Sequence, residues 1–178
     1  MHHSTFISII ANIIHPNIYV ELGLYQGETL EKNLPYVNKA YGVDMKKCDS
    51  LENLKKLHKN KLEIHYETTD IFFTHFNQKI DMAFIDADHS KESAYKDFEN
   101  VLSLLNDNGI IFIHDTDPID NKYFDKGYCG DSYKLLPILE KRNDINIITL
   151  PLTEAGLSII MKKNSSRTFL RNLNNNIY

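Results

Sequence analysis

Short apolar runs alternate with helical patterns along most of the chain. Runs typical of buried strands occur at residues 18–22, 40–44, 62–66, 80–85 and 110–113. Between them, apolar residues recur at helical spacing over residues 28–36, 48–58 and 90–105. This alternation is typical of a parallel sheet whose strands are connected by crossover helices.

The end of the chain departs from this pattern. After a predicted helix at 133–141, two apolar strands at 145–150 and 157–161 are separated by the short segment 153–156, which favours a hairpin. We therefore predict an α/β fold, a mostly parallel sheet of seven strands that ends in an antiparallel hairpin strand. The domain is expected to span residues 1–163, and the polar segment 164–178 is expected to be a mobile tail.

Composition and charge exclude several classes of protein. The 178 residues are 42% hydrophobic and 25% charged, which is typical of one globular domain. A formal net charge of −4 argues against a nucleic-acid partner, and no apolar run is long enough to span a membrane. The two cysteines, Cys48 and Cys129, are too far apart to indicate a zinc motif or a disulfide framework, so a cytoplasmic location is expected.

The loop after the first strand contains two of the seven glycines, Gly23 and Gly27. Glycine lets the backbone turn sharply and lets a ligand approach it closely. Tight packing of a strand against a helix explains the same spacing about equally well. The glycines alone therefore do not establish a binding site.

Two acidic residues near this loop favour a nucleoside ligand. Asp44 ends the second strand, where a carboxylate can accept the hydrogen bonds of a ribose diol. Glu21 precedes Gly23 by two residues, where it would repel a pyrophosphate but attract the ammonium group of a methionine moiety. S-adenosylmethionine is therefore favoured over a dinucleotide.

The segment from Glu21 through Gly23, Tyr25 and Gly27 to Thr29 resembles the cofactor loop of class I S-adenosylmethionine-dependent methyltransferases. Its Gly-x-Tyr-x-Gly order is similar to the catechol O-methyltransferase branch. The resemblance covers residues 19–162 and implies a Rossmann-like sheet with helices on both faces.

The same resemblance implies a set of cofactor-binding residues. Met45 would pack on the adenine, and Thr69 and Asp70 would border it. The complete set is Glu21, Gly23, Tyr25, Gly27, Thr29, Asp44, Met45, Thr69, Asp70, Asp86 and Asp88.

A second motif, Asp86-Ala-Asp88-His89, is similar to small-molecule O-methyltransferases of the macrolide-sugar type. In that family the first acid binds a divalent metal and the histidine is the base. Asp86 and Asp115 follow adjacent predicted strands, so their carboxylates can converge on Mg²⁺, which would lower the pKa of a bound hydroxyl. His89, with Asp86, would then be catalytic, because imidazole accepts protons near neutral pH.

Simpler explanations of these residues stay open. His89 can be a surface residue at a helix start, and Asp115 and Asp117 can belong to a turn. Catechol-type enzymes carry Asp-Asn where this chain has Asp115-Thr116, so the third metal ligand is undecided between His114, Asp117 and a residue elsewhere.

The region that would bind the methyl acceptor is less defined. The loop 116–131 or a second subunit can complete an acceptor pocket, and a homo-oligomer is left open. The aromatic residues of this region either line the pocket or pack the loop down; they are Tyr123, Phe124, Tyr128 and Tyr133.

The expected function is transfer of the methyl group of S-adenosylmethionine to a hydroxyl of a small molecule, a sugar or natural-product glycoside, with Mg²⁺. One alternative is a metal-independent methyltransferase that acts on a carbohydrate chain or a protein. The other is a cofactor-binding protein without catalytic activity.

Overall fold

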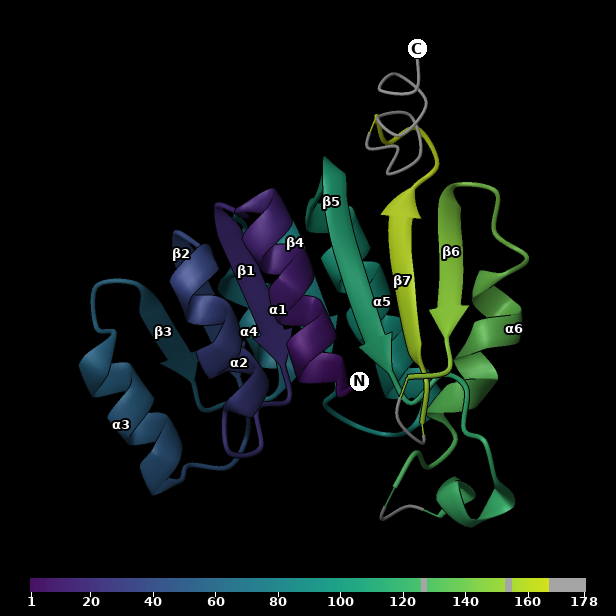
Figure 1. The fold of residues 1–178 in the computed structure, drawn as a ribbon, viewed down its shortest axis with the longest axis horizontal. Coiled ribbons are helices and arrows are strands. Elements are labelled where there is room, and N and C mark those ends of the chain that lie inside the picture. The colour runs from purple at the N-terminus through teal and green to yellow at the C-terminus, as the bar shows by residue number, and fades with distance from the viewer. Residues whose placement is uncertain (126–127, 153–154, 167–178) are drawn as a thin grey trace.

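A seven-stranded sheet forms the centre of the molecule in a computed structural model, which describes residues 1–125, 128–152 and 155–166 (Figure 1). Its strand order is β3-β2-β1-β4-β5-β7-β6. The strands are β1 (Ile18–Leu22), β2 (Lys39–Val43), β3 (Leu62–His65), β4 (Ile80–Ile85), β5 (Leu105–His114), β6 (Ile145–Leu150) and β7 (Leu157–Lys162). All neighbours from β3 to β5 are parallel, whereas β7 is antiparallel to both β5 and β6. The predicted α/β fold with a terminal antiparallel strand is confirmed.

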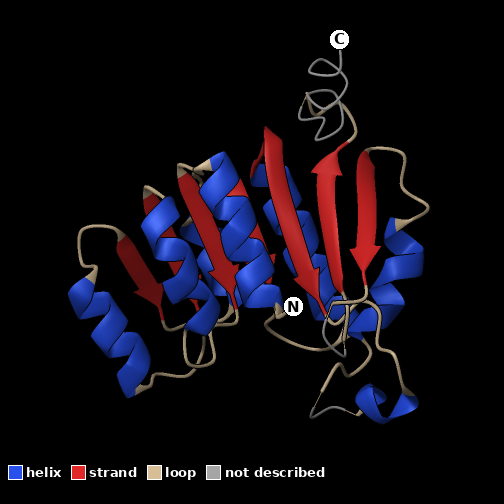
Figure 2. Cartoon of the chain, in the orientation of Figure 1, coloured by secondary structure: helices blue, strands red, loops and turns tan. Residues whose placement is uncertain are grey.

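Helices cover both faces of the sheet (Figure 2). They are α1 (His3–Ile14), α2 (Glu28–Asn33), α3 (Asp49–Leu57), α4 (Thr69–His75), α5 (Lys91–Leu104) and α6 (Leu136–Leu139). Short 3₁₀ helices lie at Leu34–Tyr36, Asn121–Phe124 and Ser132–Leu135. Buried residues of α1, α2 and α3 form one apolar core with the sheet, and those of α4, α5 and α6 form a second core on the opposite face.

The central strands are apolar on both faces because helices cover both. Along β1, Val20 and Leu22 belong to one core and Tyr19 to the other. All five residues of β1 are buried, which explains why this strand reads as a continuous apolar run interrupted by one acid, Glu21.

Three local features differ from the sequence-based expectation. Residues 106–109 were expected to form a turn, but β5 already begins at Leu105, which pairs with Ile80 before an irregularity shifts the register. Helix α4 was not predicted, although the Thr68 side chain accepts a hydrogen bond from the Ile71 N–H at its start. The helix expected at 133–141 is a 3₁₀ turn followed by the four-residue α6.

The C-terminal part of the chain is described only in part. Strands β6 and β7 pair in antiparallel register from Leu150 and Leu157 to Ile145 and Lys162, as expected of a hairpin. Residues 153–154 of the predicted turn and residues 167–178 of the predicted tail lie outside the described residues. None of the described helices is long and apolar enough to cross a membrane.

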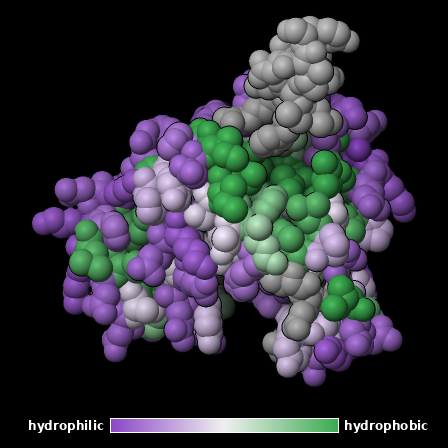
Figure 3. All heavy atoms as spheres, viewed as in Figure 1, coloured by the Kyte–Doolittle hydropathy of each residue, from purple (hydrophilic) through white to green (hydrophobic). Residues whose placement is uncertain are grey.

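Apolar side chains gather in the middle of one face of the molecule, where α1 lies beside β5 and β7 (Figure 3). Ile9 and Ile13 of α1 and Ile148 of β6 are exposed. The N-terminus lies near the ends of β4 and β5 on this side of the sheet (Figure 1). Residues that precede α1 are therefore close to the sheet edge at which the predicted site residues meet.

Candidate active site

The two glycines of the loop after β1 have clear packing roles. Gly23 has a φ of 84°, and a Cβ there would overlap the backbone of Asp86 and Ala87. Gly27 has a φ of 86° and precedes the first residue of α2. Both glycines thus take part in tight packing, and the close contact of Gly23 with Asp86 joins the β1 loop to the end of β4.

Asp44 organises the same loop. Its Oδ2 accepts hydrogen bonds from the backbone N–H groups of Leu24 at 2.9 Å and Tyr25 at 3.1 Å. Its Oδ1 accepts one from the Lys46 N–H at 2.7 Å. A carboxylate accepts about four hydrogen bonds. A ribose diol donates two, so it would have to replace one of these three.

Large apolar side chains are exposed beside Asp44. Tyr25 follows β1 and is 84% exposed, Met45 follows β2 and is 71% exposed, and Ile71 lies at the start of α4 after β3. The carboxyl ends of these parallel strands lie at one edge of the sheet. This edge has the apolar surface that a nucleoside base requires, although the side chains do not enclose it.

The environment of Glu21 bears on its expected contact with an ammonium group. Glu21 is 1% exposed, and its Oε2 accepts a short hydrogen bond from the Tyr19 hydroxyl, which also contacts Asn33. Burial raises the pKa of Glu21 to about 8, against the effect of the Tyr19 hydrogen bond. The charge argument against a pyrophosphate applies to the ionised form of Glu21, which burial disfavours in this conformation.

Asp86 and Asp115 converge, as predicted. His114 lies between them, with its Nδ1 3.3 Å from Asp86 Oδ1 and 3.1 Å from Asp115 Oδ1. The three residues form a group in which one ligand atom from each lies within 4.8 Å of the others. Of the candidates for a third ligand, His114 belongs to this group, whereas Asp117 is exposed and packs against Gly156.

The pKa shifts in this cluster favour a positive charge beside its two carboxylates. Burial raises the pKa of Asp115, the Asp86 carboxylate adds to the rise, and the two imidazoles of His114 and His89 oppose it. Burial lowers the pKa of His114, but its hydrogen bond to Asp86 and the charges of both acids outweigh this effect and raise it. The two carboxylates supply the oxygen donors that Mg²⁺ or Mn²⁺ prefers, so they fit the predicted divalent metal.

Asp115 has an unusual backbone conformation. Its φ of 60° lies in the left-handed region, which non-glycine residues rarely adopt. The residue is 5% exposed, and the Cys129 thiol contacts its Oδ1 at 3.4 Å. Strained residues of this kind are concentrated at functional sites.

His89 lies directly over the acidic pair. Its Nδ1 is 3.1 Å from Asp115 Oδ2 and also contacts the Tyr128 carbonyl oxygen, and its Nε2 is 3.9 Å from Asp86 Oδ1. A carbonyl oxygen only accepts hydrogen bonds, so Nδ1 carries the proton in this arrangement. Nε2 is then the nitrogen with a free lone pair.

The segment after β5 folds back over His89. The His89 carbonyl oxygen accepts hydrogen bonds from Asp131 N–H at 2.9 Å and Ser132 N–H at 3.1 Å. Phe124 and Tyr133 stack with ring centroids 4.5 Å apart, whereas Tyr123 is buried. Phe124 and Tyr133 border a groove of about 800 Å³, which is lined by Ala87, Asp88, His89, Ser90, Glu92, Phe124, Gly130, Asp131, Tyr133 and Lys134.

The remaining predicted cofactor residues have structural partners. Asp88 accepts hydrogen bonds from Ser90 and Ser93 at the start of α5. Asp70 pairs with Lys96 at 2.6 Å, and Thr69 bonds to Asp97, whose burial raises its pKa to about 6. Thr29 is buried in α2.

The sequence analysis missed His3. Its ring lies 4.2 Å from the ring of His114, and burial, with the nearby His114, lowers its pKa to about 4. The Nε2 of His114 and the Nδ1 of His3 are buried without a hydrogen-bond partner among the described residues. Only the apolar pattern of residues 6–14, which anchors α1 on the sheet, could have indicated that His3 reaches the site.

Comparisons with known proteins agree with this geometry. Residues 20–116 match the family model described as "Methyltransferase domain". No curated protein matches the sequence. Residues 20–116 include the loop after β1, Asp44, the Asp86-Ala-Asp88-His89 motif and Asp115.

Solved structures share the fold at low sequence identity. An O-methyltransferase from Bacillus cereus in complex with SAH is 15% identical, with a TM-score of 0.69 over 90% of this chain and 80% of that chain. TomG from Streptomyces achromogenes, an O-methyltransferase involved in tomaymycin synthesis and solved with SAM, is 16% identical, with a TM-score of 0.68 over 90% and 79%. An rRNA methylase from Streptococcus thermophilus is 14% identical, with a TM-score of 0.67 over 90% and 93%. The chain therefore belongs to this family of methyltransferase domains and has the fold of class I S-adenosylmethionine-dependent methyltransferases.

Proposed function

We propose that the protein transfers the methyl group of S-adenosylmethionine to a hydroxyl of a small molecule, a sugar or natural-product glycoside, with help from a divalent cation. The observation that carries the proposal is the convergence of Asp86, His114 and Asp115 beside His89. This cluster lies at the carboxyl ends of β4 and β5, next to the loop that Gly23 packs against Asp86.

The cofactor would bind along the ends of β1, β2 and β3. Tyr25 and Met45 offer apolar surface to the adenine, and Asp44 offers its carboxylate to the ribose. Thr69 and Asp70 would border the adenine from the start of α4. Glu21, buried and mostly protonated, would position the loop through Tyr19 rather than meet the ammonium group directly.

Asp86 and Asp115 would hold the cation, with His114 as the third protein ligand. When bound, a divalent cation orients the acceptor hydroxyl and lowers its pKa. The positive backbone φ of Asp115 aims its carboxylate at Asp86 and His114. The chain thus supplies the negative charge and the geometry.

His89 would accept the hydroxyl proton at Nε2. The Tyr128 carbonyl oxygen and Asp115 hold Nδ1–H, which fixes the tautomer and the ring orientation. Transfer of the methyl group to oxygen leaves the hydroxyl proton to be removed, and an oriented imidazole provides that step. Most of the rate enhancement would come from positioning the two reactants.

The groove beside His89 is the proposed acceptor site. Its volume of about 800 Å³ is in the range of small-molecule pockets. The stacked Phe124 and Tyr133 provide an apolar wall, and Glu92, Asp131 and Lys134 provide polar groups that can bind hydroxyls. A polar groove with an aromatic wall suits a sugar or a glycoside better than it suits a nucleic acid.

Thermal stability in the presence of S-adenosylmethionine, with and without Mg²⁺, tests the proposal. We expect the cofactor to raise the midpoint of unfolding, and Mg²⁺ to raise it further in the wild type but not in Asp115→Asn. A cofactor effect without any Mg²⁺ effect would favour the metal-independent alternative acting on a carbohydrate chain or protein. Cofactor binding without turnover on any acceptor would favour a catalytically inactive protein.

A further inference from the structure

A second group of metal-ligating side chains lies outside the proposed active site. His65 is the last residue of β3, Glu67 follows it, and His75 is the last residue of α4. One ligand atom from each of the three lies within 4.8 Å of the others. The sequence motifs and the proposed methyl transfer use none of these three side chains.

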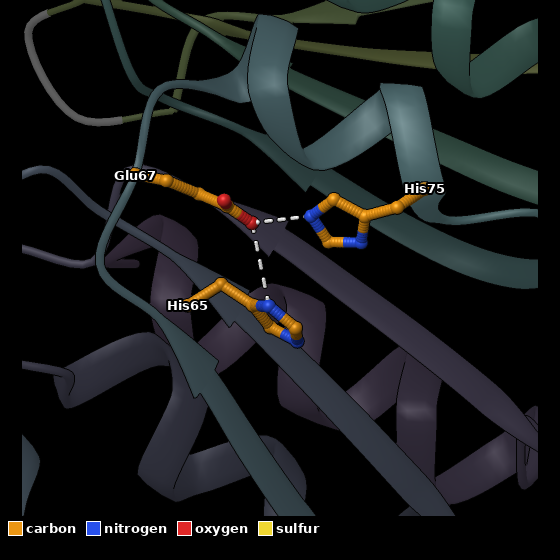
Figure 4. Close-up of side chains that lie close together, drawn as sticks. All are labelled: His65, Glu67 and His75. Carbon is orange, nitrogen blue, oxygen red and sulfur yellow. Dashed lines mark hydrogen bonds and ion pairs between the residues drawn. The ribbon is translucent and has the colours of Figure 1, made fainter.

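The two imidazoles point toward one carboxylate oxygen (Figure 4). Glu67 Oε1 is 2.8 Å from His75 Nε2 and 3.4 Å from His65 Nδ1. Ligand atoms that share a tetrahedral Zn²⁺ at about 2.0–2.1 Å lie roughly 3.3 Å apart. The two separations that involve Glu67 lie close to this value, and all three ligand atoms lie within 4.8 Å of one another.

The surroundings hold the rings in place and give Glu67 no lysine or arginine partner among the described residues. Phe72 packs edge-on against both rings, with centroids 5.1 Å from His65 and 5.8 Å from His75. Among the described residues, the ion-pair partners of Glu67 are these two imidazoles, and no lysine or arginine pairs with it. A cation would therefore complete the charge balance of the cluster.

His65 also has the outer partner that metal-bound histidines commonly have. Its Nε2 faces away from Glu67, is buried without a hydrogen bond, and lies 3.9 Å from Glu63 Oε2. A carboxylate in this position fixes the ring and the tautomer of a ligating histidine. A small movement of the exposed Glu63 side chain would complete this hydrogen bond.

We propose that His65, Glu67 and His75 bind a Zn²⁺ ion, or a first-row transition ion of similar preference. Two imidazoles and one carboxylate are the donors that such ions prefer, whereas Mg²⁺ and Ca²⁺ prefer sites in which most donors are oxygen atoms. The half-exposed His75 leaves a coordination position for water. The ion would tie the end of β3 to the end of α4 across the turn that leads to Thr69 and Asp70.

This site differs from the Asp86, His114 and Asp115 cluster in position and in donor chemistry. Metal binding at the two sites can therefore be tested separately. Zn²⁺ titration against a competing chelator is carried out in an Asp86→Asn/Asp115→Asn background, which removes the active-site acids. We expect this background to keep one zinc ion per chain. Adding His75→Gln should weaken its binding by more than roughly 100-fold, and Glu63→Gln by roughly 10-fold.

His58→Gln is the matched control, because His58 is a partly exposed histidine at the end of α3 that belongs to neither cluster. This variant should bind zinc as the background does. Glu67→Gln keeps the size of the side chain and tests the same site if His75→Gln fails to fold. The proposal is overturned if the background binds no zinc, or if binding survives either His75→Gln or Glu67→Gln in folded protein.

Discussion

The proposed role of His89 as a base depends on the position and orientation of its imidazole ring. His89 lines the groove, and its Nε2 is 3.9 Å from Asp86 Oδ1, while Nδ1 is held by Tyr128 and Asp115. Removing a general base typically costs 10²–10⁴-fold in rate. We therefore expect His89→Ala to lower kcat by about 10²–10⁴-fold and to leave cofactor affinity nearly unchanged.

The measurement is kcat of the wild type and of the variant once an acceptor is identified, with His58→Ala as the control. A mutant with near-normal turnover would show that His89 only closes the groove.

Glu21 makes the stability of the protein depend on pH. Its pKa is raised from 4.5 to about 8 in the folded protein, so the folded state binds the proton more tightly than the unfolded state. The free energy of unfolding must then fall as pH rises from 4.5 to 8, by about 1.4 kcal/mol for each unit of pKa shift.

Glu21→Gln keeps an acceptor for the Tyr19 hydroxyl and removes the titration. We expect the variant to be more stable than the wild type near pH 8, by a few kcal/mol, and to lose most of the pH dependence above pH 5. Urea unfolding midpoints measured across this range test the prediction. Parallel plots of unfolding midpoint against pH for the wild type and the variant would contradict it.

The burial of Glu21 also shows where residue-level prediction from sequence ends. An acid two residues before a glycine matched a known cofactor loop, and this match correctly indicated the family. The sequence did not show that Tyr19, two residues earlier on the same face of β1, takes up the carboxylate inside the core. Such a pairing depends on the helix packed over both side chains, which no local pattern reveals.

At the scale of elements, the contact between the β1 loop and the end of β4 joins the cofactor region to the metal cluster. Gly23→Ala would place a methyl group on the backbone of Asp86 in a left-handed conformation. Since backbone cannot move aside cheaply, we expect a loss of stability of about 3 kcal/mol or more, together with weaker binding of the cofactor.

Gly42→Ala provides the comparison for this prediction. A Cβ at Gly42 would meet only the ends of the Leu24 and Leu30 side chains, and its backbone does not have a positive φ. It should cost clearly less stability than Gly23→Ala in denaturant unfolding. Equal costs for the two variants would show that the contact of Gly23 with Asp86 is not tight.

The elements that the sequence predicted well are those with strong periodicity. Strands β1 and β4 begin and end where the apolar runs do, because helices cover both of their faces. Helix α4 escaped prediction because its seven residues are too few for a clear helical period, and α6 because it is one turn preceded by a 3₁₀ helix. The early start of β5 depends on pairing with Ile80 of another strand.

At the scale of the whole molecule, the sheet brings together two motifs that are far apart in sequence. The order β1-β4-β5 places the loop after β1, Asp86 and Asp115 at one edge, as the predicted parallel topology required. The groove was not predictable, because it forms where the segment after β5 returns to hydrogen-bond with the His89 carbonyl oxygen. Self-association, a cytoplasmic location and the absence of a nucleic-acid partner remain predictions.

A crystal structure with S-adenosylhomocysteine and Mn²⁺ tests most directly whether one edge of the sheet holds both the cofactor and the cation. We expect the nucleoside along Tyr25, Asp44 and Met45, and an anomalous peak between Asp86 and Asp115 with oxygen ligands at about 2.0–2.6 Å. A peak only at His65, Glu67 and His75, or a nucleoside bound away from the β1 loop, would contradict the proposed metal-assisted methyl transfer.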